Sequence, residues 1–198
     1  MNAPADVYDV VIVGLGPTGL TLAHGLGQRG HRVLVLEREP RFYGNARAVY
    51  TDGECMRIFQ SIGMAERLAA DMLQDAPVQK VLPSGEVLFQ IKNTERPHGW
   101  PANNFFYQPL LETALADGLA RHANVTVRRG RALTRFAQDA GGVDVFHAAS
   151  EGSGYGRQAG DVPSSGDEQG VRARWLVGAD GGRSAVRTQL GIGMTGKN

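Results

Sequence analysis

Three glycines near the start of the chain have a spacing that suits phosphate binding. Gly14, Gly16 and Gly19 form the pattern G-x-G-x-x-G within "VVIVGLGPTGL". In such a pattern the first glycine permits a tight turn, the second lets a pyrophosphate approach the backbone, and the third lets helix and strand pack closely. Because a helix N-terminus attracts phosphates, Pro17 and Thr18 complete the predicted dinucleotide site. The alternative is that the glycines serve only a tight turn.

An acidic residue follows this pattern at the end of the next predicted strand. Glu37 closes "HRVLVLE", about 20 residues beyond the glycines, where a carboxylate can accept hydrogen bonds from an adenosine ribose. A carboxylate there repels a 2′-phosphate, which argues against NADP at this site and leaves NAD and FAD open. The alternative is a solvated glutamate at a strand end.

A second glycine-rich turn lies near the end of the chain, in "RWLVGADGGRSAVR". Asp180 and Gly181, followed by Ser184 and Arg187, again come after a buried apolar run, so this turn should lie at the same edge of the sheet as the first. A domain that binds a nicotinamide dinucleotide has no obvious need for the second turn. A longer ligand, whose second nucleotide half lies farther across the sheet edge, would use both turns. The alternative is that Asp180 and Ser184 only cap a helix.

The remaining segments alternate between strand and helix patterns. Apolar, valine-rich runs predict buried strands of a parallel sheet, and apolar residues at helical spacing predict helices. We predict a Rossmann-like, three-layer α/β domain over 1–198, with a mainly parallel sheet. An antiparallel β-meander should precede Trp175, a small hairpin should span 78–91, and 150–170 should be a flexible loop. The expected elements are strands at 8–14, 31–37, 124–127, 132–138, 142–148 and 172–180, and helices at 20–30, 51–69 (interrupted at Gly63) and 108–122.

Composition excludes several classes of protein. With 21 basic and 20 acidic residues the formal net charge is +1, so the protein has no electrostatic field that would attract nucleic acid. No apolar run approaches the roughly 18 residues that span a bilayer, and the first residues lack a signal-peptide pattern. Cys55 is the single cysteine, and no spacing of metal ligands or of a nucleophile with a base is visible. We therefore expect a cytoplasmic protein without a metal and without a nucleic-acid or membrane partner.

Four motifs in order resemble those of the FAD-dependent aromatic hydroxylases, the group A flavoprotein monooxygenases. They are "GLGPTGL" with Glu37, "ARAVYTDGECMRIFQSIG", "HGWPANNFFYQPLLETAL" and "WLVGADGGRSAVR", and the 3-(3-hydroxyphenyl)propionate hydroxylase branch is the most similar. The resemblance implies an oxidoreductase of aromatic compound catabolism that binds FAD and is reduced by NADH or NADPH. It further implies that O2 and a phenolic substrate react through a flavin C4a-hydroperoxide. Asp180 and Gly181 would serve both FAD and NAD(P)H.

The resemblance also assigns roles to residues in the middle of the chain. Arg47 is expected near the flavin pyrophosphate and Gln108 near the ribityl and phosphate region, while Arg38 beside Glu37 is included in the cofactor site. Asp52 matches a position near the substrate hydroxyl, where it would assist deprotonation as the catalytic residue. The alternatives are a surface cation for Arg47, a helix cap for Gln108 and a helix N-cap for Asp52.

A second flavin signature of the family, a strand ending in "GD", is absent from the sequence. We therefore expect an N-terminal portion of a longer monooxygenase that is poorly active alone. A different class remains open: a non-catalytic module that binds ADP or a dinucleotide. An NAD-dependent dehydrogenase is disfavoured, because no acid-base pair on the substrate side is apparent and the Asp180 segment would be unexplained.

Overall fold

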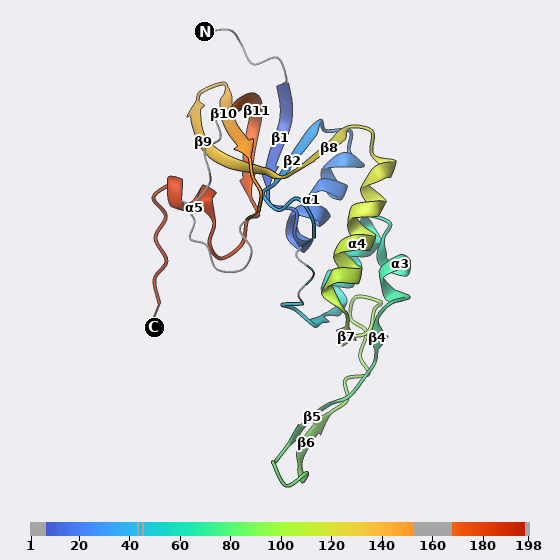
Figure 1. Ribbon diagram of the computed structural model, residues 1–198. Helices are drawn as coiled ribbons and strands as arrows, with labels where there is room; N and C mark the ends of the chain where they lie inside the picture. Colours follow the sequence, from blue (N-terminus) through green and yellow to red (C-terminus); the bar gives the residue numbers. More distant parts are fainter. Residues whose placement is uncertain (1–6, 43, 45, 153–167, 197–198) are drawn as a thin grey trace. The chain divides into compact units, whose positions relative to one another are not determined.

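The computed structural model describes residues 7–42, 44, 46–152 and 168–196, and it divides into two compact units (Figure 1). The sheet unit combines residues 1–43 with residues 119–198, and the middle unit is Gly44–Gly118. The sheet unit is thus assembled from both ends of the chain. Most of the loop predicted at 150–170 lies at 153–167, outside the described residues.

The sheet unit contains a mixed sheet in which β1 (Val7–Val13) is hydrogen-bonded to β2 (Val33–Glu37) on one side and to β11 (Gln169–Gly178) on the other (Figure 1). The first four strands of the sheet are parallel to one another, and each of the last two pairs antiparallel with the strand before it in the sheet. The mainly parallel sheet is as predicted. The order is β8 (Val125–Arg129), β2 (Val33–Glu37), β1 (Val7–Val13), β11 (Gln169–Gly178), β10 (Gly142–Ala149) and β9 (Arg131–Asp139).

One strand differs from the sequence-based topology. Of the three strands of the predicted β-meander, β9 and β10 pair antiparallel with each other, and β10 also pairs antiparallel with β11. The strand at Val125–Arg129 instead pairs parallel with β2 at the far edge of the sheet. Its short apolar pattern gives no information about its partner, because pairing between distant strands depends on the connections of the whole fold.

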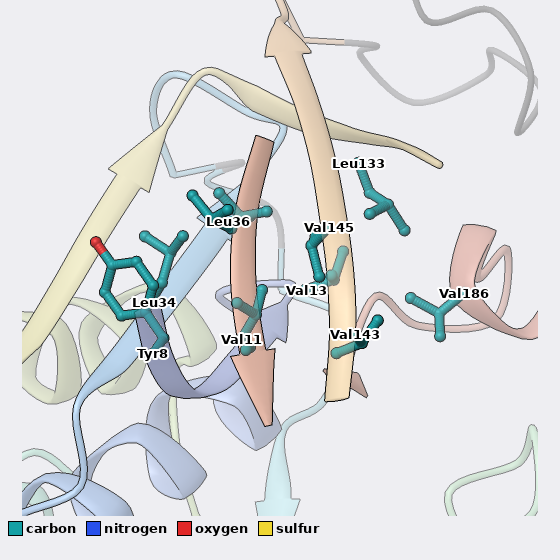
Figure 2. Packing of buried hydrophobic residues seen from close by; sticks show 11 residues of the cluster. Tyr8, Val11, Val13, Leu34, Leu36, Leu133, Val143, Val145 and Val186 are labelled. Atoms are coloured by element: carbon teal, nitrogen blue, oxygen red, sulfur yellow. The ribbon is translucent and has the colours of Figure 1, made fainter. Parts of the chain in front are cut away.

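Valine and leucine side chains of the strands form the core of the sheet unit (Figure 2). Val11 on β1, Leu34 on β2 and Val145 on β10 are completely buried, and Val186 of α5 (Ala185–Gln189) packs on the same cluster. Helix α1 (Pro17–Gly27) follows β1 directly and buries Leu20 completely. This continuous apolar character explains why the runs form strands of a parallel sheet.

The middle unit contains helices, a three-stranded sheet and the predicted hairpin. The helical pattern at 51–69 is split near Gly63 as expected, and the hairpin turns at "PSGE". The three-stranded sheet was not predicted, because strands of two residues are too short to show a period. The elements are β3 (Tyr50–Thr51), α2 (Gly53–Ser61), α3 (Ala65–Ala69), β4 (Leu73–Gln74), β5 (Val78–Val81), β6 (Val87–Ile91), β7 (Asn104–Phe105) and α4 (Gln108–Gly118). The short 3₁₀ helix η1 (Leu119–Arg121) follows α4 in the chain and belongs to the sheet unit.

A buried asparagine joins the strands of the small sheet. Asn104 on β7 is fully buried, and its Nδ2 donates to the carbonyls of Thr51 at 3.3 Å and Pro101 at 2.7 Å. Its Oδ1 accepts a hydrogen bond from Gln74 Nε2 at 2.7 Å. One side chain therefore connects β7 to both neighbouring strands, β3 and β4.

Candidate functional site

The glycine turn between β1 and α1 is enclosed by backbone at two of its glycines and open at the third. Gly14 has φ +105°, and a Cβ there would overlap the carbonyl oxygen of Ala179; a Cβ on Gly19 would overlap the carbonyl oxygen of Gly14. A Cβ on Gly16 would meet no atom within 4 Å. The backbone at Gly16, next to the N-terminus of α1, is therefore open to approach, as the predicted pyrophosphate contact would require.

Pro17 is the first residue of α1 and Thr18 lies exposed in its first turn, where N–H groups have no partner within the helix. Proline at this position loses nothing, because its missing N–H would have no such partner. Both predicted residues therefore lie at the end of the helix that attracts anions.

Glu37, at the end of β2, is hydrogen-bonded to the glycine turn. Its Oε2 accepts the N–H of Leu15 at 2.7 Å, and its Oε1 accepts the N–H of Glu39 at 2.9 Å. Each carboxylate oxygen can accept a second hydrogen bond, so the predicted ribose contact is compatible with this geometry. Arg38 is exposed and lies 3.5 Å from Glu39 through its Nε.

Asp180 follows β11 and accepts hydrogen bonds at the start of α5, whose N-cap is Ser184. Its Oδ1 accepts the hydroxyl of Ser184 at 2.6 Å, and its Oδ2 accepts the N–H groups of Ala185 at 2.6 Å and Val186 at 3.3 Å. These are the contacts of the capping alternative, while the cofactor role of Asp180 stays a prediction. Gly181 is exposed with φ +79°, a backbone conformation that glycine adopts without strain.

In the middle unit, Gln108 connects the start of α4 to the segment that carries Arg47. Its Oε1 accepts the N–H groups of Arg47 and Ala48, both at 2.8 Å. Its Nε2 donates to Glu112 Oε1 at 2.7 Å, and the residue is only 7% exposed. Glu112 was not predicted to take part, although its i, i+4 spacing from Gln108 was a usable signal. The Arg47 side chain is exposed.

Asp52 is the N-cap of α2. Its Oδ1 accepts the N–H of Cys55 at 2.8 Å, and this hydrogen bond holds the pKa of the Asp52 carboxyl below its ordinary value. A lowered pKa makes a carboxylate a weaker proton acceptor. The N-cap alternative therefore describes what the structure shows, and the catalytic role stays a prediction.

The predicted residues fall into two groups. In the sheet unit the fold brings together the glycine turn, Glu37 and the Asp180 segment: Glu37 binds the backbone of Leu15, and Ala179 lies against Gly14. In the middle unit it brings Gln108 to the backbone of Arg47. Within the described part of the chain, no group of three or more His, Cys, Asp or Glu residues could hold a metal ion. The described residues likewise include no helix with the length and apolar content needed to cross a bilayer.

The sequence matches the family described as "FAD binding domain" over residues 7–198. The chain belongs to this family of FAD-binding domains. A curated relative from Mycobacterium avium (strain 104), named 3-(3-hydroxy-phenyl)propionate/3-hydroxycinnamic acid hydroxylase, is 39% identical over 188 residues, which cover 95% of this chain and 32% of the relative. The FAD-binding domain thus spans about a third of the length of that relative, and the resemblance found in the motifs is confirmed.

Two solved structures share the fold of this FAD-binding domain. The flavin-dependent monooxygenase PieE, solved in complex with FAD and substrate, is 26% identical with a TM-score of 0.81 over 98% of this chain and 34% of PieE. The p-nitrophenol 4-monooxygenase PnpA from Pseudomonas putida DLL-E4 is 23% identical with a TM-score of 0.82, over 97% of this chain and 46% of PnpA. The predicted α/β class is therefore confirmed.

Proposed function

We propose that the chain is the FAD-binding part of an NAD(P)H-dependent monooxygenase that hydroxylates a phenolic ring. The observation that carries the proposal is the glycine turn, which is open at Gly16 in a chain of the FAD-binding domain family. The chemistry that bound FAD would supply is oxygen activation, using electrons from NADH or NADPH and O2 to place one oxygen atom on the ring.

The residues of this chain would bind and orient the cofactor. The open face of Gly16 and the first turn of α1 would take the pyrophosphate, and the remaining lone pairs of Glu37 would accept the ribose hydroxyls. The guanidinium of Arg47, a residue that is exposed, would neutralise phosphate charge. Asp180, held by its α5 contacts, would fix the backbone around Gly181 beside the glycine turn.

Asp52 would act on the substrate through its negative charge more than as a base that removes a proton. A carboxylate whose pKa is lowered by the Cys55 N–H stays charged, so it would orient a phenolic hydroxyl by accepting its hydrogen bond. We further propose that the chain alone binds FAD weakly and hydroxylates poorly, since it spans about a third of its curated relatives.

The test is a fluorescence titration of FAD with the purified chain and with Gly16→Ala. A Cβ at Gly16 enters only open space, so we expect an unfolding midpoint close to that of the unsubstituted chain. The same Cβ would enter the proposed pyrophosphate cradle, so we expect FAD affinity to fall about tenfold or more.

Parallel titrations with ADP distinguish the non-catalytic alternative. Tighter binding of FAD than of ADP would support a flavin site. Equal affinity for the two ligands, or unchanged FAD binding by Gly16→Ala, would contradict the proposal and favour a module that binds only the ADP half.

A further inference from the structure

We propose that His24, Arg121 and His122 form an acid-sensitive clasp, which holds α1 to η1 and the residue after it at neutral pH and opens locally when the pH falls. All three residues belong to the sheet unit, His24 on α1 and the other two at the end of η1. The inference goes beyond the proposed function and does not depend on it, because none of the three side chains is assigned to the cofactor site.

One guanidinium in the clasp lies against both imidazole rings. Arg121 Nε donates to His122 Nε2 at 3.2 Å, and Arg121 Nη2 lies 3.2 Å from His24 Nδ1. The same two ring nitrogens are 3.2 Å from each other. A guanidinium has five N–H donors and no acceptor, so each ring nitrogen that it contacts must present a lone pair. Both histidines are therefore neutral in the closed clasp.

The packing around the clasp opposes a proton on either ring. His24 is completely buried and His122 is half-buried, so an imidazolium formed here would lose hydration. A Cβ on Gly27 would lie 2.9 Å from Cγ of His122, which shows how closely the end of α1 approaches this ring. Burial lowers the pKa of His122, and the charge of Arg121 lowers it further. A protonated ring can leave this environment only if the segment moves away from α1.

The elements packed around the clasp offer no carboxylate to balance such a proton. Helix α1, η1 and β8 contain no Asp or Glu, and Asp117, the nearest acidic residue before Arg121 in the chain, is exposed. The other titratable or charged residues of these elements and of residues 28–32 are all basic: Arg29, His31, Arg32, Arg128 and Arg129. A proton taken up by the clasp therefore adds positive charge to a basic neighbourhood.

A hydrogen-bonded anchor that does not titrate follows the clasp in the chain. Asn124 Nδ2 donates to the carbonyls of Gly27 at 2.9 Å and His31 at 2.7 Å. A carboxamide keeps these bonds in acid, so the chain stays attached to the end of α1 beyond the clasp. We therefore expect an opening of η1 and His122 alone, without unfolding of the sheet unit.

The direction of the pKa shift gives the pH range. The ordinary pKa of His122 is 6.5, and its folded value is lower. An unfolded chain then binds the proton at a higher pH than the folded chain does. The clasp thus contributes its full stabilisation above pH 6.5, and this stabilisation is lost as the pH falls through the folded value.

The main experiment compares His122→Gln with the unsubstituted chain by urea denaturation at about pH 7.5 and about pH 5.5. A glutamine oxygen can replace Nε2 as the acceptor for Arg121, but it binds no proton in this range. The measured quantity is the rise of the unfolding equilibrium constant from the higher pH to the lower. We expect this rise to be about threefold or more larger in the unsubstituted chain than in His122→Gln.

The matched control is His31→Gln, which removes an exposed histidine of the same unit. Its rise should equal that of the unsubstituted chain. An equal rise in the unsubstituted chain and His122→Gln would overturn the inference, because the acid sensitivity would then come from other groups.

A second variant, Arg121→Met, tests the shared guanidinium. It removes the charge and the donors but leaves the burial of His122, which acts on the pKa more strongly than the charge does. We expect the rise to fall between those of the unsubstituted chain and His122→Gln. A rise as large as that of the unsubstituted chain would overturn the role of Arg121 in the clasp.

Hydrogen exchange tests whether the opening is local. The amide of His122 donates to the Leu119 carbonyl at 2.9 Å, and that of Val33 donates to the Asn124 carbonyl at 2.9 Å. Between about pH 7.5 and about pH 5.5 we expect the protection factor of the His122 amide to fall about tenfold and that of Val33 to change less than about twofold. Unchanged protection at His122, or a parallel fall at both amides, would overturn the inference.

Discussion

The glycine turn of the sheet unit and the Arg47 segment of the middle unit are shaped in opposite ways. At the turn, Gly14 and Gly19 leave space for backbone carbonyls, and any side chain would overlap them. The Arg47 segment is held by one long side chain, that of Gln108, which binds two backbone N–H groups. The first region is therefore damaged by adding atoms and the second by removing them.

The largest effect should come from adding one carbon to the turn. Gly14→Ala places a Cβ on the Ala179 carbonyl oxygen at φ +105°, so we expect the free energy of unfolding to fall by about 3 kcal/mol or more. Urea denaturation measures this, with Gly16→Ala as the matched control whose Cβ meets no atom within 4 Å. Equal stability of the two variants would contradict the account of the turn.

The next effect should come from removing a side chain in the middle unit. Asn104→Ala deletes hydrogen bonds to Gln74, Thr51 and Pro101 at a fully buried position, so we expect a loss of about 2 kcal/mol. The control is Asn103→Ala, since Asn103 accepts from Asp75 only through its backbone carbonyl. A comparable loss in both variants, measured by urea denaturation, would show that the small sheet does not depend on the Asn104 carboxamide.

A smaller effect is expected at the cap of α2. Asp52→Ala removes the acceptor of the Cys55 N–H and should cost about 1 kcal/mol near neutral pH, while Asp52→Asn should retain most of it. Because the folded pKa of Asp52 lies below its ordinary 3.8, the ionic part of this stabilisation is present above pH 3.8 and is lost as pH falls through the folded value. Denaturation of the three proteins across this range measures the effect. A stability difference between the native protein and Asp52→Ala that grows on acidification would contradict the prediction.

The sequence predicted the elements that depend on local patterns. The run from Val10 to Val13, the turn at Gly14 and the helix after it can all be read from neighbours in the chain, and so can the hairpin at 78–91. The partner of β8 and the two-residue strands around Asn104 were not predicted. Both depend on pairings between residues far apart in sequence, for which a short apolar run contains no information.

The candidate site shows the same division. The sequence by itself determined the glycine pattern and the motifs of a FAD-binding domain, because a tight turn and a helix N-terminus are built from consecutive residues. Only the tertiary structure decided what the polar side chains bind: Glu37 the N–H of Leu15, and Gln108 the N–H of Arg47, which lies 61 positions away. A hydrogen bond needs its two atoms within about 3 Å of each other. For residues so distant in the chain, only the folded backbone can bring the two atoms that close together.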